Sequence, residues 1–164
     1  LGGDVMNEVI ITMVRRKHNL AIGHHSAEKL RVETGYLING PVQTRTIYGI
    51  HTVSGLPSSA EIPSEDIREA ITETADNIAD ALLTTLQRTP PQLLENIRQN
   101  GIYLSGGVSL TPNIACYLQE KVTFPVYNIP DPVFNTLNGI VTILNDKELR
   151  KLTFSLKDYI GNLI

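Results

Sequence analysis

A glycine-rich turn between two apolar segments places the strongest constraint on the fold of this chain. Ile102 to Leu104 form a short apolar run that is followed by the pair Gly106-Gly107. Thr111 is a suitable N-cap residue, and Pro112 suits a first helical turn, so a strand, a tight turn and a helix over 112–121 are predicted. Glycine lets a backbone approach a flat or anionic ligand closely. Many strand-to-helix connections need glycine for geometry alone, so the turn by itself leaves both interpretations open.

A second segment, residues 26–34, predicts a short helix. Ser26 is a suitable N-cap residue and Gly35 suits the C-terminal end. Charged pairs with helical spacing follow one another along it, Glu28 with Arg31 and Lys29 with Glu33. Each pair shares a helix face, and the commonest structure for such pairs is a solvated charged surface.

Apolar spacing elsewhere predicts helices and strands in alternation. Helices are expected over 4–18, 64–88, 90–100 and 133–144, and strands over 42–53, 59–62, 102–105 and 125–129. The expected helix caps are Asp4, Ser64, Thr89 and Asp146. An apolar stripe along helix 64–88 predicts that this helix packs into the core. Strand 102–105, the next helix and strand 125–129 make a βαβ unit, which implies parallel pairing.

Composition excludes several classes of function. The formal net charge is −3, aromatic residues make up 5% and Trp is absent, so no nucleic-acid partner is expected. Cys116 is the sole cysteine, and its helical position predicts a small buried side chain. No metal site is expected around the adjacent His24 and His25, because their side chains diverge and lack a partner at zinc-like spacing. No run has transmembrane length and no signal peptide is visible, which favours a cytoplasmic protein.

Several short motifs occur in the order typical of a known family. They are Gly2–Asn7 (GGDVMN), Val14–Gly23 (VRR followed by IG), Ala27–Gly35 (AEKLRVETG), Gly55–Pro57 (GLP), Thr89–Leu93 (TPPQL), Gly101–Leu110 (GIYLSGGVSL) and Asp131-Pro132. Together they resemble the actin/Hsp70/hexokinase ATPase superfamily, and most closely its MreB-like bacterial actins. The ordered set spans nearly the whole chain.

The resemblance implies an α/β actin-like ATPase fold, in which a ribonuclease H-like sheet is flanked by helices, with only part of the second lobe present. It assigns residues 1–100 mainly to the outer subdomain of that lobe and its connecting helices. Residues 101–164 are assigned to the returning inner subdomain, which carries the glycine turn.

The family binds ATP or ADP with Mg²⁺ in a cleft between two lobes. The resemblance places these residues on the adenosine side of the cleft: Glu28, Lys29, Leu30 and Arg31 on the helix, and Gly106, Gly107, Val108 and Ser109 at the turn. Glu28 would accept hydrogen bonds from the ribose, and Arg31 would lie over the adenine or donate to the sugar. Gly2 and Gly3 match a second glycine pair near the phosphates. The chain departs from the family where Val108 replaces a glycine and Arg31 replaces a lysine.

MreB-like proteins form double filaments beneath the inner membrane and organise cell-wall synthesis, and so determine rod shape. The resemblance therefore implies self-association, the cell-wall elongation machinery as partner, and a cytoplasmic, membrane-associated intact protein. The phosphate-binding hairpins, the Mg²⁺ ligands and the catalytic residues of the family lie outside this fragment. We expect that the chain alone does not hydrolyse ATP, because phosphoryl transfer depends on those groups.

Two other interpretations stay open. A divergent actin-fold scaffold, of the cell-division or pilus-assembly adaptor type, would bind nucleotide with little or no turnover. An Hsp70-type chaperone fragment would share the GGD start and the charged helix, but Thr89–Leu93 fits the MreB-like proteins better.

Overall fold

The structure is a computed structural model that describes residues 2–153. The chain folds into two compact units, Leu1–Pro132 and Val133–Ile164. The family resemblance places a subdomain boundary at residues 100–101, which differs from the boundary between these two units. The subdomain assignment stays a prediction.

The first unit contains the described elements up to the second parallel strand. In chain order these are α1 (Gly3–His18), β1 (Leu20–Ala21), α2 (His24–Thr34), β2 (Thr44–His51), β3 (Pro57–Pro63), α3 (Ser64–Gln87), α4 (Pro91–Asn100), β4 (Ile102–Leu104), the 3₁₀ helix η1 (Gly107–Leu110), α5 (Ile114–Val122) and β5 (Val126–Asn128). The described part of the second unit holds α6 (Asn135–Asn145) and the 3₁₀ helix η2 (Leu149–Leu152).

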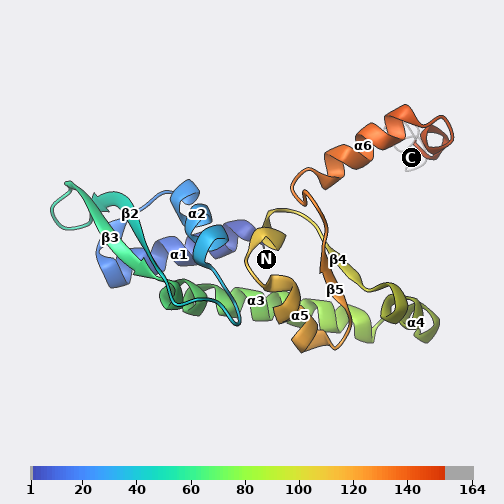
Figure 1. The fold of residues 1–164 in the computed structure, drawn as a ribbon, viewed down its shortest axis with the longest axis horizontal. Coiled ribbons are helices and arrows are strands. Elements are labelled where there is room, and N and C mark those ends of the chain that lie inside the picture. Colours follow the sequence, from blue (N-terminus) through green and yellow to red (C-terminus); the bar gives the residue numbers. More distant parts are fainter. Residues whose placement is uncertain (1, 154–164) are drawn as a thin grey trace, which may run out of the picture. The chain divides into compact units, whose positions relative to one another are not determined.

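Two sheets form in the first unit. Strands β1, β2 and β3 make an antiparallel sheet in that order, with Tyr48 opposite Ser59. Strands β4 and β5 pair in parallel, with Tyr103 opposite Tyr127, which confirms the predicted parallel unit. The long helix α3 contacts β3 of the antiparallel sheet near its N-terminal end. Further along, it contacts α5, the helix that connects β4 and β5 (Figure 1).

The core of the first unit lies where α1, α2, α3 and α5 meet. Each of these helices supplies fully buried apolar side chains, which include Met6, Ile10, Val14, Leu30, Ile67, Ile71, Ala75, Ile114 and Leu118. The members on α3 belong to the predicted stripe and follow its helical spacing, so burial of this stripe confirms the prediction.

Most predicted helices are present, but several predicted caps are wrong. Helix α2 begins at His24, so Ser26 lies inside it. The N-cap position of α1 is Gly2, which places Asp4 within the first turn. Thr89 does not cap α4, because its hydroxyl donates to Thr85 O and extends the end of α3 instead. The N-cap position of η2 is Glu148, and Asp146 lies two residues earlier, where its Oδ1 accepts hydrogen bonds from Glu148 N and Leu149 N.

Ser64 is the first residue of α3, and its hydroxyl bonds to the segment that precedes β2. It accepts a 3.2 Å hydrogen bond from Gln43 N and donates one to Pro41 O. A tertiary contact therefore replaces the predicted local cap.

The segment after the glycine turn also differs from its prediction. The α-helix begins at Ile114, after η1, and Asn113 has a left-handed backbone with φ of 60°. Thr111 and Pro112 are therefore not the cap and first residue of this helix. Cys116 is exposed, because the buried face of α5 is formed by Ile114, Tyr117 and Leu118.

Candidate functional site

Helix α2 presents Glu28 and Arg31 on one face. The two residues lie three apart, and Arg31 Nη2 is 3.7 Å from Glu28 Oε1. Their environments differ strongly, since the Arg31 side chain is 1% exposed and that of Glu28 is 49% exposed. Glu28 is thus a carboxylate available to a ligand, and it is oriented by a buried cation beside it.

The Arg31 guanidinium is held by groups from two other segments. Its Nε donates to Asn7 Oδ1 on α1 at 3.2 Å. Its Nη1 donates to Gly107 O at 3.2 Å and to Thr111 Oγ1 at 2.6 Å. Burial lowers the pKa of Arg31, and the nearby negative charges of Glu28 and Asp4 oppose that shift. The resemblance predicted contact of Arg31 with adenosine, whereas in the structure these donors are engaged by the protein.

The glycine turn is ordered by its own hydrogen bonds. Gly106 has a φ of 86°, a conformation that favours glycine, and its N–H donates to Pro132 O at 2.9 Å. The Ser109 hydroxyl donates back to Gly106 O at 2.7 Å. A Cβ added to Gly106 or to Gly107 would meet no atom of residues 2–153 within 4 Å. One side of this backbone is therefore open to a ligand.

The first glycine pair of the chain lies beside this turn. A Cβ added to Gly3 would be 3.6 Å from Arg31 Nη2 and 3.7 Å from Val108 Cγ2. A hollow of about 210 Å³ adjoins the turn and is lined by Gly2, Ile78, Leu104, Ser105, Val108, Ser109, Ile114 and Leu118. The folded chain thus brings the two glycine-rich motifs together, although about one hundred residues of sequence separate them.

Two of the predicted site residues lie elsewhere. Leu30 is 1% exposed and belongs to the core. Lys29 lines a different hollow, of about 280 Å³, together with residues of β2 that include Arg45 and Tyr48. Of the predicted set, the structure groups Arg31, Gly106, Gly107, Val108 and Ser109, with Glu28 attached through Arg31.

Sequence reasoning missed Asn7 and Thr111, which bind the guanidinium. Both are polar and buried. Asn7 lies within the first glycine motif, but its role depends on a residue of another helix. Thr111 was interpreted as a cap because it precedes proline, and its local sequence carries no signal for a distant arginine.

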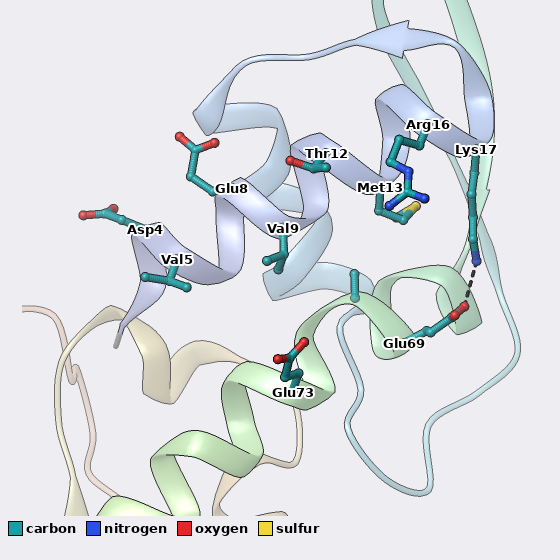
Figure 2. Close-up of a pocket in the computed structure, with 11 residues that line it drawn as sticks. Asp4, Val5, Glu8, Val9, Thr12, Met13, Arg16, Lys17, Glu69 and Glu73 are labelled. Carbon is teal, nitrogen blue, oxygen red and sulfur yellow. Dashed lines mark hydrogen bonds and ion pairs between the residues drawn. The ribbon is translucent and has the colours of Figure 1, made fainter.

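A more voluminous hollow of the first unit is a groove between α1 and α3, of about 750 Å³ (Figure 2). Val5, Val9, Met13 and Ala70 give it apolar walls, and charged side chains surround them: Asp4, Glu8, Arg16, Lys17, Glu69 and Glu73. Lys17 is paired with Glu69 at 2.7 Å, as the dashed line in Figure 2 shows. None of the predicted site residues lines this groove, so size alone would have pointed away from the glycine turn.

The described part of the chain offers no metal centre. No group of three or more His, Cys, Asp or Glu residues within 2–153 is arranged to hold an ion. The open glycine backbone and the exposed Glu28 carboxylate are chemically suited to a nucleoside. No helix in that range is long and apolar enough to span a bilayer.

The architecture is that of an actin-like ATPase fold. MreB5 of Spiroplasma citri bound to ADP superposes with a TM-score of 0.80 at 31% identity, over 87% of this chain and 44% of that protein. The same protein bound to AMPPNP gives a TM-score of 0.82 at 30% identity, over 99% of this chain and 46% of that one. The MamK double helical filament, at 19% identity and a TM-score of 0.72, shares the fold.

Sequence comparison agrees. The sequence model of the MreB/Mbl protein family matches residues 1–152. The cell shape-determining protein MreB of Escherichia coli (strain K12) is 33% identical over 140 residues, which are 85% of this chain and 40% of that protein. The cell shape-determining protein Mbl of Bacillus subtilis (strain 168) is 28% identical over 149 residues, 90% of this chain and 45% of that protein. The chain belongs to the MreB/Mbl family, and it spans less than half the length of these relatives.

Proposed function

We propose that this chain forms the adenosine-binding part of a filament-forming bacterial actin that determines cell shape. The observation that carries the proposal is the open backbone of Gly106 and Gly107 close to the exposed carboxylate of Glu28, with the buried Arg31 between them. The nucleotide-bound MreB5 structures support it, because that relative has the same fold at about 30% identity.

The residues would divide the work of binding a nucleoside. Glycine backbone at the turn allows a flat base to lie close to the chain. The Glu28 carboxylate can accept hydrogen bonds from the two ribose hydroxyls. Bound Mg²⁺ would neutralise phosphate charge, and its ligands would come from groups other than those described here. The residues of this chain would therefore recognise the base and the ribose of the nucleotide.

Self-association into filaments is the second part of the proposal. The names of the curated relatives, cell shape-determining proteins, and the MamK filament support it. We infer that the intact protein works in the cytoplasm at the inner membrane, with the cell-wall elongation machinery as partner. Sedimentation and electron microscopy, with and without ATP, test the assembly, and a protein that stays monomeric under both conditions would contradict it.

Calorimetric titration of ATP and ADP into the full-length natural protein tests the nucleotide site. Glu28→Ala should weaken binding about tenfold, because a hydrogen bond to a charged acceptor contributes roughly 1.5–3 kcal/mol, reduced here by exposure to solvent. Glu120→Ala, which removes an exposed carboxylate from α5, is the matched control and should leave binding unchanged. Equal affinities of the unaltered protein and Glu28→Ala would contradict the role of Glu28.

A scaffold with little nucleotide turnover is the alternative, and Val108 is the observation that favours it. This branched side chain stands where the family has glycine, and it lines the hollow at the turn. If the unaltered protein fails to bind nucleotide but Val108→Gly binds it, the site is present but occluded, and the scaffold interpretation replaces the first.

A further inference from the structure

Arg31 joins the two sides of the proposed site through one buried group. Its guanidinium bonds to Gly107 and Thr111 at the turn, and its Nη2 lies 3.7 Å from the Glu28 carboxylate. We propose that Arg31 is a positioning residue, which fixes the turn relative to Glu28 and does not itself contact the nucleotide. This inference rests on the proposed function.

The geometry of the guanidinium makes this role possible. Its donors lie in one plane with fixed directions, so several acceptors are held at defined angles at once. Here the acceptors are Asn7 Oδ1 on α1, and Gly107 O and Thr111 Oγ1 in the segment of the glycine turn. A lysine at this position would supply one nitrogen and could not maintain the same set of directions.

Burial makes the arrangement rigid. A charged group that is 1% exposed is costly unless its donors are satisfied. Movement of the turn away from α2 would remove the acceptors Gly107 O and Thr111 Oγ1 together. The free energy needed to leave this cation unpaired therefore restrains the turn in its observed position.

The hydrogen bond to Gly107 also sets which side of the turn is open. The Gly107 carbonyl is directed toward Arg31, at 3.2 Å from Nη1. The position of a Cβ on Gly107 is clear of other described atoms within 4 Å. Rotation of this peptide would direct the carbonyl oxygen elsewhere and would change the surface that a base could approach.

A pair of identical substitutions separates positioning from stability. Thr111→Val removes the hydroxyl that accepts from Arg31, whereas Thr34→Val removes a similarly buried hydroxyl on α2 that donates to Leu30 O. In the full-length natural protein we expect Thr111→Val to weaken ATP binding about fivefold, and Thr34→Val to leave it unchanged. Thermal melting of both variants shows whether they are destabilised to a similar extent.

A second readout does not depend on nucleotide. The amide resonances of Gly106 and Gly107, followed by NMR in the unliganded protein, should shift in Thr111→Val and in Arg31→Lys but not in Thr34→Val. Arg31→Lys should also weaken ATP binding by more than tenfold, because it loses several of the directed hydrogen bonds. Together these results would support positioning by Arg31.

Other results overturn the inference. If Arg31→Lys weakens ATP binding while Thr111→Val changes neither affinity nor the glycine resonances, Arg31 acts by direct contact. If Thr111→Val and Thr34→Val lose affinity equally, the effect is one of stability. If the unaltered protein binds ATP and Arg31→Lys binds it equally well, only this inference fails. If the unaltered protein binds no nucleotide, the proposed function fails and the inference fails with it.

Discussion

Tyr117 donates a 2.6 Å hydrogen bond from its phenol to Asp76 Oδ1, and this bond joins α5 to α3. Lys121 Nζ lies 2.8 Å from the same oxygen and 5.2 Å from the centre of the Tyr117 ring. Burial, followed by the bond to Asp76, raises the pKa of Tyr117. Hydrogen bonds from Lys121 and Tyr117 lower the pKa of Asp76. Helix α5 follows the glycine turn, so this cluster anchors the segment beyond the candidate site.

Removing the phenol oxygen should therefore destabilise the first unit. Tyr117→Phe keeps the ring in place but leaves Asp76 with Lys121 alone, and we expect a loss of about 1 kcal/mol in the free energy of unfolding. Tyr103→Phe removes a hydroxyl from an exposed ring and should change stability little. Urea denaturation of the two variants measures the difference, and equal losses would show that the bond to Asp76 contributes nothing.

Acid should weaken the contact between α1 and α3. Asp66 Oδ1 lies 2.8 Å from Lys17 Nζ, and its Oδ2 lies 2.9 Å from His18 Nε2. Burial raises the pKa of Asp66, but the hydrogen bonds from Lys17 and His18 outweigh this effect and leave the pKa below its ordinary value. Ionised Asp66 therefore stabilises the fold above its unfolded pKa of about 3.9, and this contribution is lost as pH falls through the folded pKa.

The pH prediction is checked by urea denaturation of the unaltered protein and Asp66→Asn from pH 7 down to pH 3. We expect the unaltered protein to be the more stable of the two at pH 7, with a difference that narrows below about pH 4. Asp80→Asn, which changes an exposed carboxylate of α3 without an ion pair in the described structure, should change the stability at pH 7 little. A constant difference across this range would refute the role of Asp66.

A side chain at position 101 should destabilise the first unit. The φ of Gly101 is 80°, and an added Cβ would overlap the Tyr127 ring and approach Pro125 O to 3.1 Å. Gly106→Ala is the matched control, because its φ of 86° and ψ of 174° resemble the 80° and −178° of Gly101 but its Cβ position is open. We expect Gly106→Ala to cost about 2 kcal/mol for this backbone conformation, and Gly101→Ala to cost clearly more. Thermal denaturation measures both, and similar losses would show that Tyr127 moves aside freely.

Cys116 should react in the native protein. Its exposure predicts labelling by a thiol reagent such as DTNB at a rate near that of a free thiol, without denaturant. Cys116→Ser, which has no thiol, is the negative control for the labelling reaction. Labelling that requires urea would instead support the buried position that the sequence alone suggested.

The sequence predicted elements whose signal is local and periodic. The stripe on α3 follows helical spacing, because one face of that helix meets the core. The parallel pairing of β4 and β5 follows from two strands joined through a helix. Helix boundaries were predicted less accurately than helix positions. Ser26, Ser64 and Thr89 are suitable N-caps by residue type, but none of them caps a helix in the structure. Hydroxyl groups bond to whichever backbone group the fold brings near, and this choice is not local.

The candidate site shows the same division. The resemblance of the ordered motifs gave the family. The sequence by itself determined the order of the elements and the glycine turn, because turn geometry and apolar spacing depend on near neighbours. Only the tertiary structure decided that Arg31 is buried, that it bonds to Asn7 and Thr111, and that Lys29 and Leu30 lie away from the turn. Helix α2 has several faces, and its sequence does not say which face the other helices cover. Burial selects the partner of each side chain, and residues far apart in sequence provide that burial.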